Sequence, residues 1–344
     1  MNEPLAEYTN TETQLRLSRE DSLKDNFITK LKLYLSIARP DHWVKHIFIL
    51  PGIILAMLLI PVWSANYKSN IILGLISACL IASANYIINE WLDAEFDQHH
   101  PHKSQRAAVS GQLKASVVYL EYFACAISGI LIAYFISTLF LITSLTFLLS
   151  GIVYNVRPFR TKERAYLDVI SESFNNPIRI MLGWSMISSA TIPPISLLLI
   201  FWFGGAFLMS VKRYSEYKLI RNNAGFAALA SYRRSFANYS EASLLTSSFF
   251  YAILSSFALG IFLIKYRAEY ILAVPLFAIL FSYYLYLGVS DAQSVQAPEK
   301  LHREKGLIFI LALLVLMLIG LTIFELPKIA GIFHSTFHAI NLGF

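Results

Sequence analysis

The sequence predicts an all-α, polytopic membrane protein with about nine transmembrane helices around a central cavity that opens to the cytoplasmic side. Three observations indicate this class. Hydrophobic residues make up 56% of the 344-residue chain, and charged residues only 15%. Apolar runs of about 20 residues, the length that crosses a bilayer as a helix, recur along the chain. Most Lys and Arg residues fall between those runs, on one predicted side of the membrane.

Nine segments are long and apolar enough to span, at approximately 44–63, 70–90, 115–135, 137–156, 168–190, 192–211, 244–264, 269–290 and 306–325. The basic loops place the N-terminus in the cytoplasm and the C-terminus outside, so the predicted location is the cytoplasmic (inner) membrane. Membrane topology therefore accounts for the net charge of +6. A nucleic-acid partner has little support.

The chain is predicted to form one membrane domain with two tails. Residues 1–24 are polar and mixed in charge, which indicates a mobile tail, and 331–344 form a C-terminal tail. Within the domain, 25–330, the segment 25–38 is a candidate amphipathic helix lying at the membrane interface. Arg39-Pro40 is expected to end it, because the residue before a proline is disfavoured in the helical region.

The second apolar run closes with three oxygen-bearing side chains at intervals of four residues. Asn89, Asp93 and Asp97 would lie on one face of a helix, about 6 Å apart per step. Carboxylates at the mouth of a membrane helix are costly unless they are paired, hydrated or bound to a metal. Oxygen ligands suit Mg²⁺, particularly when the metal also carries a phosphate substrate. We therefore predict a catalytic magnesium–diphosphate site at these three residues; a solvated helix end is the alternative.

Basic residues follow this acidic face. Lys103 and Arg106 could neutralise phosphate oxygens that the metal does not reach. The same loop contains three histidines, His99, His100 and His102, which could suggest zinc. They lack the companion Cys/His pair of a zinc site, so we interpret them as loop residues that could hydrogen-bond a phosphate.

A second basic segment begins at Tyr154 and includes Arg160 and Lys162. The alternative interpretation is ordinary positive flanking of a membrane helix. Asp168, Glu172 and Asn176 then repeat the spacing of four, leading into the predicted fifth span. Charges inside a span usually face a bundle interior or an aqueous cavity, so these residues are expected to form a second polar wall.

Two further interpretations stay open at this stage. An internal ion pair between Glu172 and Arg179 would explain the charges of the fifth span without any ligand. A third basic segment, Lys212, Arg213 and Tyr214, follows the sixth span and fits either a membrane interface or a phosphorylated ligand.

These motifs resemble the UbiA superfamily of intramembrane prenyltransferases. Asn89-x3-Asp93-x3-Asp97 with the basic residues after it resembles the first aspartate-rich motif of that superfamily, and 154–162 resembles its tyrosine–basic motif. Finer similarity to the decaprenyl-phosphate phosphoribosyltransferase subgroup lies in 38–45, which ends at Lys45, and in 212–216, 233–239 and 297–300. Family prenyltransferases usually carry a second aspartate-rich motif after the sixth span, where this chain has Glu216 as its only acid.

The resemblance implies a Mg²⁺-dependent membrane transferase that moves 5-phosphoribose from phosphoribosyl diphosphate, a soluble donor, to a polyprenyl phosphate. The candidate substrate-binding residues, from the motifs and the resemblance together, are Lys45, Lys103, Arg106, Tyr154, Arg160, Lys162, Asp168, Glu172, Lys212, Arg213 and Tyr214, with Arg233 and Arg234 as weaker candidates. The long isoprenoid chain would lie between helices, open to membrane lipid. The first alternative is transfer of a polyprenyl group from its diphosphate to an aromatic or lipid acceptor. The second alternative is a membrane transporter or scaffold.

Overall fold

The structure, a computed structural model, describes residues 29–98, 104–109, 111, 113–266, 268–290, 293–296, 301 and 303–324. Every regular element in these residues is helical, which confirms the predicted all-α class. The predicted tails, 1–24 and 331–344, and the first residues of the predicted interfacial helix, 25–28, lie outside the described ranges.

Eight helices in the described part are long and apolar enough to cross a membrane, and each overlaps a predicted span. They are Thr29–Leu59, Tyr67–Glu95, Ala115–Ile136, Thr138–Asn155, Ile195–Ala224, Glu241–Tyr266, Glu269–Val289 and Lys305–Ile323. Large apolar side chains such as Leu120, Phe135 and Phe257 are exposed on the outside of the bundle. Such surfaces are stable in lipid, since the bilayer core is itself apolar.

The predicted fifth span, 168–190, is not one continuous helix. It is divided at Phe174 into α6 (Leu167–Ser173) and α7 (Asn175–Ile187). Pro177 explains the division, because its nitrogen cannot donate to the carbonyl of Ser173 and its ring crowds that carbonyl. The break leaves α6 outside the long apolar helices and puts its acidic residues near α8 (Ile195–Ala224).

The first membrane segment also has an internal break, at the predicted position. Residues 29–37 are helical, and Arg39 adopts a left-handed conformation with φ 51°. The chain continues through the 3₁₀ helix η1 (Pro40–Ile49) into α2 (Leu50–Leu59). The helix over 29–37 thus ends at the break that Arg39-Pro40 predicts, and its place at the membrane interface stays a prediction.

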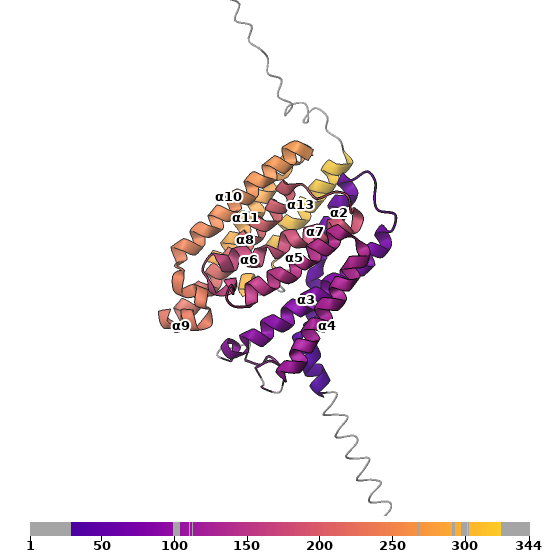
Figure 1. The fold of residues 1–344 in the computed structure, drawn as a ribbon. Helices are drawn as coiled ribbons and strands as arrows, with labels where there is room; N and C mark the ends of the chain where they lie inside the picture. Colours follow the sequence, from indigo (N-terminus) through magenta and orange to yellow (C-terminus); the bar gives the residue numbers. More distant parts are fainter. Residues whose placement is uncertain are drawn as a thin grey trace, which may run out of the picture.

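The long helices form two groups that α7 joins. On one side α3 (Tyr67–Asp97) packs along α4 (Ala115–Ile136), and on the other α8 packs along α10 (Glu241–Tyr266) (Figure 1). Between them α7 contacts α3, α8 and α5 (Thr138–Asn155). The helices α11 (Val274–Val289) and α13 (Lys305–Ile323) pack together, and α11 also contacts α8.

Close backbone packing holds α7 against α2. A Cβ atom added to Gly52 would lie 2.3 Å from the carbonyl oxygen of Ile180, and one added to Gly183 would lie 2.4 Å from that of Ile49. Only glycine allows two helices to approach so closely, as in other membrane helix interfaces built on small residues.

The short helices gather at the end of the bundle where α3, α5 and α8 finish. They are η2 (Thr161–Glu163), α6, α9 (Phe226–Tyr232) and η3 (Arg234–Asn238), while η4 (Ala268–Ala273) and α12 (Gln293–Gln296) flank α11. Figure 1 shows α9 at the same end as the last turns of α3. This end carries the predicted functional residues.

A cavity of about 790 Å³ lies at the opposite end of the helices. Mostly apolar side chains line it, including Trp184, Phe257 and Ile261, and it lies between the ends of α2, α7 and α10 and the start of α8. The predicted central cavity at the cytoplasmic end stays a prediction.

Candidate functional site

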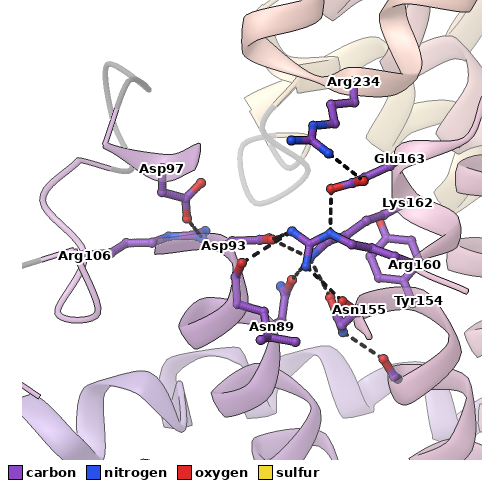
Figure 2. A network of polar contacts seen from close by, with 12 residues as sticks. Asn89, Asp93, Asp97, Arg106, Tyr154, Asn155, Arg160, Lys162, Glu163 and Arg234 are labelled. Atoms are coloured by element: carbon purple, nitrogen blue, oxygen red, sulfur yellow. Dashed lines mark hydrogen bonds and ion pairs between the residues drawn. The ribbon is translucent and has the colours of Figure 1, made fainter. Parts of the chain in front are cut away.

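The acidic face of α3 forms as the spacing predicts. The helix continues unbroken to Asp97, so Asn89, Asp93 and Asp97 occupy successive turns at its end. Asp97 is buried and Asp93 is largely so. Both carboxylates are paired: Asp97 Oδ2 accepts a hydrogen bond of 2.6 Å from Arg106, and Asp93 meets the segment that follows α5 (Figure 2).

Lys162 lies where the end of α3 contacts the segment after α5. Its Nζ donates to Asp93 Oδ1 at 2.5 Å, to Asn155 Oδ1 at 2.8 Å and to Asn89 Oδ1 at 3.0 Å (Figure 2). The side chain is buried, and burial lowers the pKa of its ammonium to about 8 although the Asp93 carboxylate opposes that shift. Three oxygens from two helices thus surround one cationic nitrogen.

Arg160 links the Asp93 carboxylate to the backbone at the end of α5. Its guanidinium donates to Asp93 Oδ1 at 3.1 Å, to the carbonyl oxygen of Asn155 at 3.0 Å and to Glu163 Oε1 at 2.6 Å. Arg160 has a φ of 33°, which is costly for a residue with a Cβ. The hydrogen bonds of its own side chain hold this conformation, which brings Lys162 back towards α3.

A second polar cluster lies between α6, α8 and η3, and Arg213 is its centre. The Arg213 guanidinium contacts Glu172 Oε2 at 2.6 Å, Glu216 Oε2 at 3.0 Å and Asp168 Oδ2 at 3.5 Å. Asp168 is fully buried and also accepts hydrogen bonds from Ser235 and Tyr239. Arg213 itself is 2% exposed.

Tyr154 connects the two clusters. Its hydroxyl donates to Glu172 Oε2 at 2.8 Å, and its ring centroid lies 5.9 Å from Lys162 Nζ. The second polar wall predicted from Asp168 and Glu172 is therefore adjacent to the first. The alternative ion pair between Glu172 and Arg179 is wrong: Glu172 pairs with Arg213, and Arg179 Nη1 donates to Asn176 at 3.3 Å.

Several predicted residues lie elsewhere or in other roles. Lys45 is on η1, 3.1 Å from His42 Nδ1, and Tyr214 packs in an apolar cluster with Tyr217 and Phe236. Arg213 was expected to offer its charge to a substrate, but its burial among three carboxylates makes it an organising residue. Lys212, whose Nζ is 3.9 Å from Glu216, is less buried. Lys103 and the histidines His99, His100 and His102 lie outside the described residues.

The structure adds residues that the sequence interpretation did not place in the site. Asn155 holds both Lys162 and Arg160. Arg233, already a weaker candidate from the sequence, has its Nη1 3.6 Å from Asp168 Oδ2. Glu163 contacts Arg160 and also Arg234, at 3.2 Å. Asn155 had one sequence signal, since it is a polar residue at the end of an apolar run and directly after Tyr154.

The donor set of the first cluster fits a magnesium ion. Mg²⁺ takes oxygen ligands, usually one or two carboxylates together with water and substrate phosphate. In the part of the chain that the structure describes, no group of three or more His, Cys, Asp or Glu side chains could hold a metal without such help. However, oxygens of Asp93 and Asn89 already converge on a cation, the Lys162 ammonium. Asp93 and Asn89 could therefore hold a metal together with phosphate oxygens, and Asp97, one turn further and paired with Arg106, stays the third predicted ligand.

The fold and this polar site define a multi-pass integral membrane protein with the two described polar clusters at one end of the bundle. A model of the UbiA prenyltransferase family matches residues 47–311. The chain belongs to this family, a class of membrane transferases. That membership counts against the transporter or scaffold alternative.

Among curated relatives, a decaprenyl-phosphate phosphoribosyltransferase of Mycolicibacterium smegmatis is 26% identical over 209 residues, covering 60% of this chain and 62% of the relative. Nodulation protein NoeC of Azorhizobium caulinodans is 27% identical over 213 residues, covering 60% of this chain and 63% of the relative. The matched part thus spans less than two thirds of either relative. A solved UbiA homolog from Archaeoglobus fulgidus, bound to DMAPP and Mg²⁺, has the same fold, with a TM-score of 0.62 and 20% identity over 84% of this chain and 98% of that one.

Proposed function

We propose that the protein transfers 5-phosphoribose from phosphoribosyl diphosphate to a polyprenyl phosphate, with release of diphosphate. The similarity to decaprenyl-phosphate phosphoribosyltransferases supports this substrate class. The observation that carries the proposal is the second cluster, where the acids of α6 and α8 surround Arg213 and lie beside Lys212 and Arg233. Lys212 and Arg233, which keep part of their surface exposed at this cluster, suit an acceptor that carries its own phosphate, whereas an aromatic acceptor would need no such cations.

The first cluster would receive the donor. Arg160 and Lys162, which now contact Asp93, would bind diphosphate oxygens, and Arg106 lies beside Asp97. When the bond between ribose C1 and the diphosphate oxygen breaks, negative charge grows on the departing oxygens. Fixed positive charges in a buried site stabilise that change strongly. A magnesium ion held by Asp93, Asp97 and Asn89 would supply further neutralisation of the leaving group.

The second cluster would receive the acceptor. Lys212 and Arg233 keep about a fifth of their side-chain surface exposed, at 21% and 20%, and are the groups we assign to the acceptor phosphate. An oxygen of that phosphate forms the new bond to C1 as the diphosphate leaves. Because the acceptor is already anionic, no strong general base is required. Tyr154, between the clusters, would separate the two phosphate positions.

Transfer of a polyprenyl group from its diphosphate is the second candidate function. The Archaeoglobus fulgidus homolog of the same fold was solved with DMAPP and Mg²⁺, which favours this chemistry. The same Arg160 and Lys162 would serve, because diphosphate leaves from a carbon that develops positive charge in both reactions. The two candidates differ in the donor and acceptor and share the first cluster.

A two-donor assay distinguishes them. Purified protein with Mg²⁺ and polyprenyl phosphate is expected to take label from phosphoribosyl diphosphate, and Asp93→Asn is expected to lose at least about a thousandfold in rate because a ligand charge is removed. Far-UV circular dichroism checks that the variant is folded. Label that moves only from a prenyl diphosphate to an aromatic or lipid acceptor would reverse the assignment. Full activity of Asp93→Asn would remove the proposed donor site.

A further inference from the structure

The three oxygens around Lys162 Nζ make one position for one cation. Asn89 and Asp93 supply two of them from α3, and Asn155 supplies the third from the end of α5, all within 3.0 Å of the nitrogen. Asn155 is held in this orientation, because its Nδ2 donates to the carbonyl oxygen of Gly151 at 2.9 Å. We refer to these three oxygens as the cradle. Its members are fixed by two helices that pack against each other.

Two of the cradle oxygens belong to residues that would hold the magnesium ion. An ammonium and a divalent cation that shared these oxygens would stand within about 4 Å of each other and would repel strongly in a buried site. Arg160 increases the conflict, since its guanidinium contacts the same Asp93 oxygen at 3.1 Å. We therefore expect metal binding at these oxygens to displace Lys162 from the cradle.

We propose that Lys162 and the divalent cation are alternative occupants of the cradle, and that the metal enters only together with a diphosphate. The inference rests on the proposed function in one respect, namely that the donor carries a diphosphate. Oxygens of that group give the Lys162 ammonium new acceptors, so the lysine moves from the protein carboxylate to the substrate. The cradle oxygens are then available to the metal, and no buried charge is left unpaired at either stage.

This exchange couples the two ligands thermodynamically. If diphosphate raises the affinity for the metal, the metal must raise the affinity for diphosphate by the same factor. Without donor, the Lys162 ammonium balances the charge of Asp93, and the protein binds free metal poorly. The lysine thus acts as a positioning residue for the metal as well as a ligand of the donor.

Binding of Mn²⁺, a paramagnetic substitute for Mg²⁺, tests the exchange by electron paramagnetic resonance on the full-length protein in detergent. Wild-type protein is expected to bind Mn²⁺ alone weakly, and at least about tenfold more tightly with inorganic pyrophosphate, compared at equal free Mn²⁺. Lys162→Met is expected to bind Mn²⁺ alone at least about tenfold more tightly than wild type, since the competing charge is gone. Lys218→Met is the matched control, because Lys218 Nζ donates to the carbonyl oxygen of Val289 and not to the cradle.

Three outcomes would overturn the proposal. In the first, Lys162→Met binds Mn²⁺ no more tightly than wild type. In the second, Lys218→Met gains as much Mn²⁺ affinity as Lys162→Met. In the third, pyrophosphate does not change the Mn²⁺ affinity of the wild-type protein. The third needs no variant, so it decides even if Lys162→Met does not fold. Loss of phosphoribosyl transfer with intact coupling to pyrophosphate would contradict only the proposed function. Transfer without that coupling would contradict only the exchange.

Discussion

Arg213 shows how a residue type can be identified correctly and still have an unexpected role. A basic residue after the sixth span suggested a phosphate ligand, yet the guanidinium is buried and contacts Asp168, Glu172 and Glu216. A buried cation surrounded by acids neutralises them, so its removal leaves several carboxylates without a counter-charge. Lys162 differs, because its neighbours include two neutral amide oxygens and it can leave them at lower cost.

Replacing Arg213 therefore tests an organising role against a substrate-binding one. Arg213→Ala is expected to lower the free energy of unfolding by about 3–5 kcal/mol, the usual cost of breaking a buried ion pair. Lys212 Nζ lies 3.9 Å from an oxygen of Glu216. Lys212→Ala is therefore expected to lower the free energy of unfolding by less than about 1 kcal/mol. Thermal unfolding in detergent measures both. Equal stability of the two variants would argue that Arg213 is not structural.

Tyr154 has a hydroxyl bonded to one cluster and a ring facing the other. Tyr154→Phe removes the hydrogen bond to Glu172 but keeps the ring near Lys162, so kcat/KM is expected to fall about tenfold or somewhat more, in line with a bond to a charged group. For Tyr154→Leu, kcat/KM is expected to fall further, because the ring is lost as well. Steady-state kinetics with both variants measures this. Identical losses would show that the ring has no separate role.

At the scale of elements, α7 decides the shape of the site. Its glycine contact with α2 lets it lie between the two helix groups, and α6, which precedes the break at Phe174, contacts α8. A continuous fifth helix would carry Asp168 and Glu172 along the same axis as α7. Asp168 and Glu172 of α6 reach Arg213 of α8 and so form the second cluster.

The packing of α7 against α2 can be measured with one methyl group. Gly183→Ala is expected to destabilise the protein by about 1–3 kcal/mol, because the new Cβ would lie 2.4 Å from the Ile49 carbonyl oxygen, a rigid backbone atom. Gly260→Ala in α10 is the matched control, since no atom lies within 4 Å of its added Cβ. Alanine there is expected to leave stability unchanged or slightly raised. Similar melting temperatures for both variants would contradict the close approach.

At the scale of the whole molecule, the charge distribution predicts the orientation. The ends of α3, α5 and α8 carry the basic clusters, and basic segments are retained on the cytoplasmic side. We therefore expect the candidate site to face the cytoplasm, where a soluble phosphorylated donor is available. The apolar cavity beside Trp184 would lie near the outer surface.

Cysteine labelling of intact cells tests this orientation. In a variant without Cys79 and Cys125, Ser189→Cys on the loop after α7 is expected to react with a membrane-impermeant maleimide. Ser240→Cys, just before α10 on the side of the site, is expected to react only after the cells are opened. Both serines lie at exposed positions, so accessibility does not distinguish them. The reverse labelling pattern would place the site outside.

Local geometry explains what the amino-acid sequence alone determined. Composition and the length of the apolar runs predicted the helical membrane class, and a spacing of four predicted that Asn89, Asp93 and Asp97 share a helix face. These inferences succeed because they depend on residues near one another in the chain. The end of the first helix at Arg39-Pro40 is another example, since one backbone conformation decides it.

The partners of each charge were decided only by the tertiary structure. Lys162 reaches Asp93 across 69 residues, and Arg213 reaches Glu172 across 41, because helix packing brings distant segments together. A sequence can show that a cation is present, but its energy depends on which oxygens surround it and how far it is buried. In the sequence, Lys162 and Arg213 are both simply basic residues. Only the fold gives them different surroundings, an oxygen cradle for Lys162 and three carboxylates for Arg213.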